Sequence, residues 1–162
     1  MRTFKLIRPT AAVAGIVHLI RHKLMARKLQ KVVLIDDNET TSFLNNRLLQ
    51  RLELAENVLS FTNAEQAFAH FWGKQSGSDS DAPELVFVDL KMPGMDGFEF
   101  LNQYNRLAPE QREKTVMAVL TTSMHSADTT RVAQYEGVEY LAKPLTEEKM
   151  QRLLQKRFAL AN

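Results

Sequence analysis

Carboxylate side chains occur in this sequence at the ends of apolar runs. The run "KVVLID" (31–36) ends on Asp36 and continues into Asp37, and the run "ELVFVD" (84–89) ends on Asp89. A single acid after a strand is often no more than a helix N-cap. Three carboxylates brought together would repel one another, and some would take up a proton unless a cation lay between them. The chemistry of these acids therefore depends on whether the fold brings them together.

Hydroxyl groups and a lysine lie near the ends of two other apolar runs. The run at 114–123 contains Thr121 and Thr122 near its end, and a later run ends in Lys143 followed by Pro144. Alone, a threonine is a common strand residue and a lysine usually lies in solvent. Beside a carboxylate cluster, however, a hydroxyl supplies a hydrogen bond and an ammonium supplies a positive charge for phosphoryl oxygens.

These side chains together would have the composition of a magnesium site. Asp36, Asp37 and Asp89 offer only oxygen ligands, and the chain contains no cysteine. Oxygen ligands favour a hard ion that keeps several waters, so Mg²⁺ is the expected ion, with Mn²⁺ as an alternative. A metal held by carboxylates can bind a phosphoryl oxygen at an in-line displacement. A carboxylate can also be the nucleophile, because it can form an acyl phosphate.

Apolar runs alternate with helical patterns from residue 31 onward. The runs predict strands at 31–36, 57–62, 84–89, 114–123 and 138–144. Segments with helical spacing of their apolar residues follow them, at 39–54, 63–74, 97–108, 126–137 and 146–159. Five such alternations predict an α/β fold, a doubly wound parallel sheet with helices on both faces. The carboxyl ends of parallel strands share one sheet edge, so the polar side chains above should be neighbours there.

Two helical segments carry more detailed expectations. In 39–54, Leu44, Leu48 and Leu52 are spaced by four residues, and we expect this stripe to face the core. The last segment should begin after Thr146 as its N-cap, because an acidic first turn follows that residue.

Composition and charge exclude several classes of function. The 162 residues suffice for one domain with a tail, and the absence of cysteine excludes disulfides, zinc–thiolate sites and thiol nucleophiles. Residues 1–31 hold eight basic and no acidic residues, which leaves about −6 of the net +2 for residues 32–162. A mildly acidic body is not typical of a nucleic-acid-binding protein.

The basic leader, residues 1–30, contains the apolar stretch "TAAVAGIVHLI". This stretch is shorter than the roughly 20 apolar residues that span a bilayer. We therefore expect a cytoplasmic location and no stable membrane insertion. Two interpretations stay open. The leader is either an amphipathic helix that touches a membrane or partner, or a disordered or non-native extension, since Met25 would be a natural start before the first strand.

Four ordered motifs resemble the receiver domain of two-component response regulators. They are "IDDNE" at 35–39, "VDLKMPGMDG" at 88–97, "VLTTS" at 119–123 and "YLAKP" at 140–144. The resemblance covers residues 31 to about 158, so we expect a receiver domain over 31–162. It implies a flavodoxin-like sheet with strand order 2-1-3-4-5.

The resemblance implies roles for the acidic cluster. Asp89 would be the phosphoacceptor and a metal ligand, and Asp37 would be a direct ligand of Mg²⁺. Asp36 would act through a bound water, and the backbone carbonyl of Lys91 would complete the protein's share of the coordination.

The resemblance also implies a switch. Thr121, with Thr122 beside it, would contact the phosphoryl group, and Lys143 would pair with that group. The bond between Lys143 and Pro144 would be cis. Tyr140 occupies the position of the switch aromatic residue, although it would also suit a half-buried strand.

The expected function is that of a single-domain response regulator in a two-component or phosphorelay system, without a DNA-binding output domain and not a turnover enzyme. It would be phosphorylated by a histidine kinase or phosphotransfer protein and would act on a protein target or a second copy. One alternative is a degenerate receiver that binds partners without phosphorylation. Another is an aspartyl-phosphate phosphatase, but such an enzyme needs an acid where this chain has Lys91. Because Lys91 and Thr122 would flank the route of water to the acyl phosphate, we expect a persistent phosphorylated state.

Overall fold

Five parallel strands form the centre of the computed structural model, which describes residues 28–73 and 81–159. Most of the leader interpreted above lies outside the described residues. The strands are β1 (Leu29–Ile35), β2 (Ala55–Phe61), β3 (Leu85–Val88), β4 (Val116–Thr121) and β5 (Glu139–Ala142). Their order in the sheet is β2-β1-β3-β4-β5, so the predicted parallel sheet and its strand order are confirmed.

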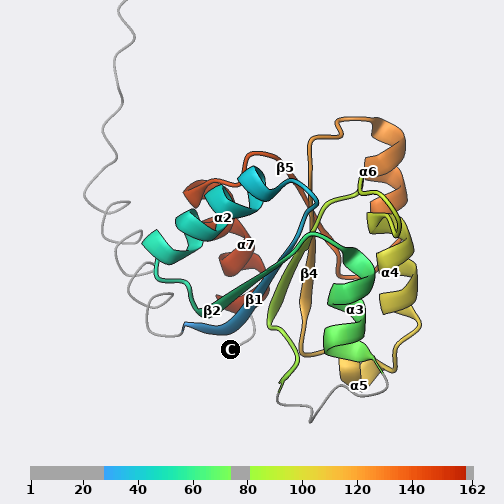
Figure 1. Ribbon diagram of the computed structural model, residues 1–162, viewed down its shortest axis with the longest axis horizontal. Coiled ribbons are helices and arrows are strands. Elements are labelled where there is room, and N and C mark those ends of the chain that lie inside the picture. The colour runs from blue at the N-terminus through green and yellow to red at the C-terminus, as the bar shows by residue number, and fades with distance from the viewer. Residues whose placement is uncertain (1–27, 74–80, 160–162) are drawn as a thin grey trace, which may run out of the picture.

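Helices cover both faces of this sheet (Figure 1). They are α2 (Glu39–Arg51), α3 (Ala64–Trp72), α4 (Gly97–Asn105), α5 (Pro109–Arg112), α6 (Ser126–Val132) and α7 (Glu147–Leu154), the last continued by the π-helical turn η2 (Gln155–Ala159). Helices α2 and α7 lie on one face, and α3, α4 and α6 on the other. The short α5 was not predicted; it begins at Pro109, whose fixed φ suits the first position of a helix. None of the helices in 28–73 and 81–159 is long and apolar enough to span a bilayer.

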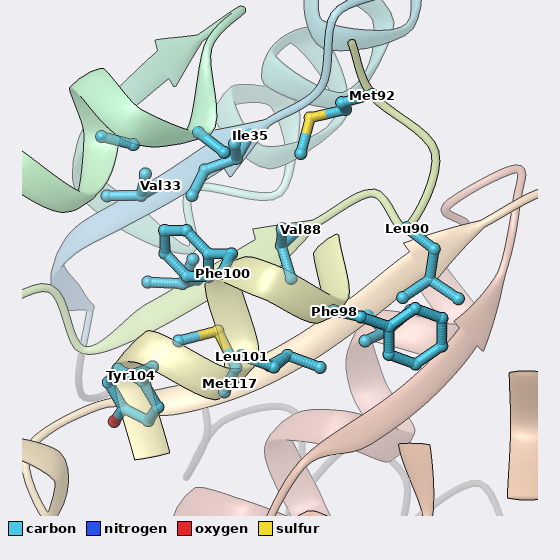
Figure 2. Packing of buried hydrophobic residues seen from close by; sticks show 14 of the residues in the cluster. Val33, Ile35, Val88, Leu90, Met92, Phe98, Phe100, Leu101, Tyr104 and Met117 are labelled. Carbon is cyan, nitrogen blue, oxygen red and sulfur yellow. The ribbon is translucent and has the colours of Figure 1, made fainter. Parts of the chain in front are cut away.

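Alternate side chains of each strand enter two separate cores. Val33, Ile35 and Val88 point toward α3, α4 and α6, where Phe100 packs over them (Figure 2). Leu34 and its neighbours on the opposite face pack against α2 and α7. Because both faces are covered, the inner strands β1, β3 and β4 carry apolar residues at successive positions rather than only at alternate ones.

The face that α2 buries differs from the predicted one. Leu44 is 60% exposed, so its place in the expected core stripe is wrong, whereas Leu49 is fully buried. Leu48 and Leu52 are partly buried and pack against the core as expected. Ser42 and Asn45 share the buried face of Leu49. This face is partly polar because it lies against the acids: the Ser42 hydroxyl donates to the Asp36 carbonyl, and Asn45 lines a small cavity with Asp36 and Asp89.

The sheet register brings the polar strand ends together. Ile35 pairs with Val88, so Asp36 and Asp89, the residues that follow them, lie side by side at the sheet edge. Val88 also pairs with Val119 of β4. Thr121 at the end of β4 pairs with Ala142, the residue before Lys143. The common edge expected from the sequence is thus present.

A pair of leucine substitutions tests the orientation of α2. Leu49→Ala should lower the free energy of unfolding by about 2–5 kcal/mol, because a buried leucine leaves a cavity. Leu44→Ala, on the same helix, should change it by less than about 0.5 kcal/mol. Urea denaturation measures both values. Similar losses for the two variants would contradict this orientation.

Candidate functional site

Three carboxylates gather at the carboxyl edge of the sheet. Oxygens of Asp36, Asp37 and Asp89 all lie within 4.8 Å of one another. Asp36 and Asp89 are only 5% and 8% exposed, while Asp37 is open to solvent. The sheet therefore brings together the three acids that the sequence singled out.

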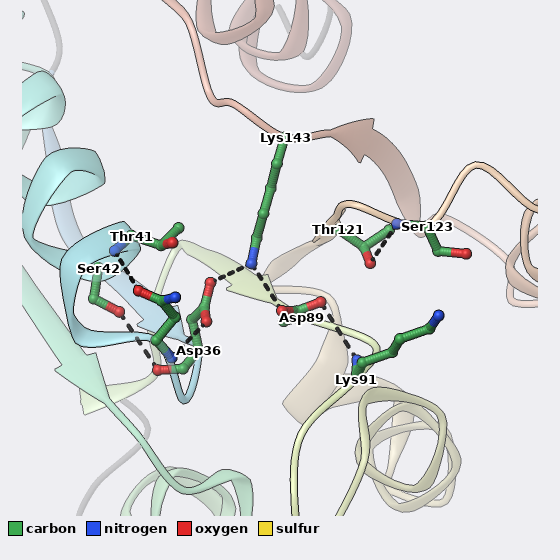
Figure 3. A network of polar contacts seen from close by, with 9 residues as sticks. Asp36, Thr41, Ser42, Asp89, Lys91, Thr121, Ser123 and Lys143 are labelled. Carbon is green, nitrogen blue, oxygen red and sulfur yellow. Dashed lines mark hydrogen bonds and ion pairs between the residues drawn. The ribbon is translucent and has the colours of Figure 1, made fainter.

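The connection from β1 to α2 holds Asp36 in place (Figure 3). Its carboxylate accepts a hydrogen bond from the backbone N–H of Asn38 at 2.9 Å, and its carbonyl accepts one from the hydroxyl of Ser42 at 3.5 Å. Asn38 in turn caps α2, because its side chain accepts from the N–H of Thr41 at 3.0 Å. A short polar turn therefore fixes the acid and starts the helix together.

The turn after β3 positions Asp89. The N–H of Asp89 donates to the carbonyl of Ile35 at 3.0 Å, and its carboxylate accepts from the N–H of Lys91 at 3.4 Å. Helix α4 starts with a reciprocal capping box between Asp96 and Glu99. Gly97, its first residue, lies so close to the Asp89 carbonyl that a Cβ there would collide with it. This glycine thus supports the site, whereas the sequence showed it only as the start of a helical segment.

Lys143 supplies the cation between the two buried acids. Its ammonium Nζ lies 2.6 Å from Asp36 Oδ2 and 2.8 Å from Asp89 Oδ2 (Figure 3). Burial acts to lower the pKa of Lys143, but hydrogen bonds to Asp36 and Asp89 outweigh burial and hold it above its ordinary value. The ammonium therefore stays charged and separates carboxylates that would otherwise repel. The peptide bond from Lys143 to Pro144 is cis, as expected.

The expected switch residues contact one another through the connection after β4. Thr121 is fully buried, and its hydroxyl accepts from the N–H of Ser123 at 3.2 Å. The half-buried Tyr140 donates its hydroxyl to the carbonyl of Ser123, whose own hydroxyl donates to Asp128 at the start of α6. Thr122 is exposed. Ser123 thus links the threonine, the tyrosine and α6, a role that its residue type alone did not indicate.

The donor set fits a hard divalent cation. All the side-chain donors of the cluster are carboxylate oxygens, and one of the three acids faces solvent, where an ion can keep waters. Lys91 is exposed, and its backbone N–H contacts the Asp89 carboxylate. This composition suits Mg²⁺ better than a softer metal.

Comparison with known proteins agrees with this geometry. The pattern of the response regulator receiver domain family matches residues 32–155. A two-component response regulator from Cytophaga hutchinsonii has a similar structure, with a TM-score of 0.74 and 25% sequence identity over 82% of this chain and 99% of that one.

Curated relatives include longer proteins. The chain is 29% identical to a probable methanogenesis regulatory protein, FilR2, from Methanothrix harundinacea, over 76% of this chain and 78% of FilR2. It is also 30% identical to the sensory/regulatory protein RpfC from Xanthomonas campestris. That match covers 81% of this chain but only 17% of RpfC. The chain therefore corresponds to one part of some relatives and to most of others.

Removal of the Lys143 charge should destabilise the protein unless Mg²⁺ is present. Lys143→Met leaves two buried carboxylates without their cation, which should cost roughly 3 kcal/mol in the presence of a chelator. Magnesium should recover more stability in this variant than in the wild type, because only there does it replace a missing charge. Urea denaturation with EDTA and with Mg²⁺ provides the comparison.

The pKa of Lys143 sets the pH range of this effect. Because its pKa is higher in the folded state, the contribution of Lys143 is complete below its ordinary pKa and is lost as pH rises through the folded value. The two proteins should therefore become more alike in strongly alkaline solution. Lys156→Met, which removes an exposed partner of Glu139, is the control and should lose less than about 1 kcal/mol. Equal stability of Lys143→Met and wild type in EDTA would contradict the account.

Proposed function

The chain belongs to the family of response regulator receiver domains, and from this premise we propose that Asp89 accepts a phosphoryl group in a Mg²⁺-dependent reaction. The donor is the phosphohistidine of a histidine kinase or phosphotransfer protein. The observation that carries the proposal is the ammonium of Lys143 held between the carboxylates of Asp36 and Asp89, with Asp37 beside them.

Each residue of the cluster has a role in this reaction. A carboxylate oxygen of Asp89 attacks phosphorus as the bond from phosphorus to the histidine nitrogen breaks, and the imidazole leaves with the electron pair of that bond. The product is an acyl phosphate on Asp89. Asp37, Asp89 and the Lys91 carbonyl are the proposed ligands of Mg²⁺, and Asp36 acts through a bound water. The ion offsets negative charge on the phosphoryl oxygens.

Lys143 is the group that the new phosphate redirects. Before phosphorylation its ammonium pairs with Asp36 and Asp89 at 2.6 and 2.8 Å. The phosphorylated Asp89 offers additional acceptor oxygens and more negative charge, so the ammonium moves to them. No other lysine or arginine of the described residues forms an ion pair with the cluster.

Thr121 and Tyr140 turn this local change into a surface change. The hydroxyl of Thr121 leaves the N–H of Ser123 and donates to a phosphoryl oxygen, and Tyr140 releases the carbonyl of Ser123. The start of α6 follows, since Ser123 also bonds Asp128. This is a shift between two packings of one fold. The altered face, formed by α6, β5 and α7, binds a protein target or a second copy of the chain.

The proposed role is a signalling switch and not turnover of an external substrate. We place it in the cytoplasm, where kinases with bound ATP are available, without a nucleic-acid ligand. Relatives such as RpfC include additional sequence, so the single-domain form stays a prediction. The proposal names no particular kinase, stimulus or target protein. An aspartyl-phosphate phosphatase is disfavoured because Lys91 stands where an acid would be needed.

Phosphate incorporation tests the proposed reaction. With Mg²⁺ and radiolabelled acetyl phosphate, the wild type should gain a base-labile phosphate and Asp89→Asn should gain none. Asp81→Asn, at an exposed acid paired with Lys31, is the matched control and should be labelled like the wild type. Omission of Mg²⁺ should abolish labelling. Equal labelling of Asp89→Asn and wild type would assign the phosphate elsewhere, and no labelling of the wild type would favour a phosphorylation-independent binding module.

The lifetime of the phosphate tests the role of Thr122. This exposed residue follows the buried Thr121. We infer that its β-branched side chain crowds the approach of water to the phosphorylated Asp89. Thr122→Ala should therefore shorten the half-life of the phosphorylated protein, while Thr130→Ala on α6 should not. Loss of label after removal of the donor gives the rate. A wild-type half-life of seconds, or no change in Thr122→Ala, would refute this role.

A further inference from the structure

We propose that Lys149 is a positioning residue for Lys143, an inference that rests on the phosphoryl-accepting role proposed above. Lys149 lies in the first turn of α7. It would not touch the phosphoryl group. It would instead hold the backbone from which the Lys143 side chain reaches Asp36 and Asp89.

Lys149 contacts the backbone on both sides of Lys143. Its ammonium Nζ donates to the carbonyl of Ala142 at 2.5 Å and to the carbonyl of Pro144 at 2.8 Å. These are the carbonyls of the residues immediately before and after Lys143. The backbone N–H of Lys149 also donates to the hydroxyl of Thr146, the N-cap of α7, at 3.3 Å. One residue thus ties the last residue of β5, the connection and the helix start together.

The charge of Lys149 is unusual for its place in the helix. A cation in the first turn is disfavoured by the helix dipole, which suits the acids Glu147 and Glu148. Those acids have other partners, since Glu147 accepts from Gln151 and Glu148 pairs with Arg152. Within the described residues, Lys149 forms no ion pair that would offset the unfavourable position. Its two carbonyl partners are therefore the interaction that accounts for a lysine here.

The backbone of Lys143 is consequently held from two sides. Its N–H donates to the carbonyl of Thr121 at 2.9 Å, which fixes it to β4, and Lys149 fixes the flanking carbonyls. Only the side chain of Lys143 is left free to move from Asp36 toward a phosphoryl group. A displacement of about 1 Å at such a position can slow a reaction by roughly a hundredfold, so a fixed backbone matters for the rate.

A double-mutant comparison tests this role. Lys149→Met keeps most of the apolar stem but removes the ammonium, and it should slow phosphorylation by acetyl phosphate about tenfold. In a Lys143→Ala background, where Asp89 and the other acids remain, the same substitution should change the rate by less than about twofold. Lys156→Met, on the turn that continues α7, is the control and should leave the rate unchanged. Urea denaturation verifies that each variant is folded, and Lys149→Gln replaces Lys149→Met if the latter does not fold.

A second readout separates this inference from the proposed function. The backbone amide signal of Lys143 in a ¹⁵N NMR spectrum should move in Lys149→Met and stay in place in Lys156→Met. An unchanged Lys143 signal would overturn the inference even if the wild type is phosphorylated normally. Equal slowing by Lys149→Met in both backgrounds would also overturn it, because it would show a general structural effect. A wild type that takes up no phosphate would refute the proposed function, while the Lys143 amide signal would still test whether Lys149 holds the backbone of Lys143.

Discussion

The ammonium of Lys143 between the carboxylates of Asp36 and Asp89 is the interaction on which the site depends. Two largely buried acids at one sheet edge repel each other, and the ammonium between them offsets that repulsion. In the proposed function, the same ammonium also serves the phosphoryl group, because it passes from the two carboxylates to the new phosphoryl oxygens on Asp89. In this view the ion pair belongs to the resting state and is replaced, rather than broken, when the phosphate arrives.

The fold delivers this geometry through register and hydrogen bonds of the backbone. Parallel pairing sets Ile35 beside Val88, so Asp36 and Asp89 emerge side by side, and the N–H of Lys143 binds the carbonyl of Thr121. Apolar cores on both faces stabilise the strands, so the polar residues beyond the strand ends are not needed for the core and can form a site. The polar buried face of α2 and the close packing of Gly97 on Asp89 belong to the same arrangement.

Much of this structure follows from sequence patterns. Continuous apolar strands predict a covered parallel sheet, and the acids, threonine and lysine at the strand ends predict a shared site, because both depend only on residue type and spacing. The prediction that Leu44 faces the core was wrong, because the spacing of leucines does not show that part of α2 lies against acids. The links made by Ser123 and Lys149 run through backbone carbonyls and N–H groups, which carry no signature in the residue types. The roles of the site residues in phosphoryl transfer stay predictions.

In the proposed switch, the Lys143 ammonium moves from the carboxylates to the phosphoryl group. A high-resolution crystal structure with Mg²⁺ and beryllofluoride tests this movement most directly, because the BeF₃ group on Asp89 stands in for a phosphoryl group. The account predicts that Lys143 Nζ leaves its 2.6 Å contact with Asp36 and lies within hydrogen-bond distance of a fluorine atom. It also predicts that the Thr121 hydroxyl turns from the N–H of Ser123 toward the same group. A complex in which beryllofluoride is bound to Asp89 while Nζ still bridges both carboxylates would contradict it.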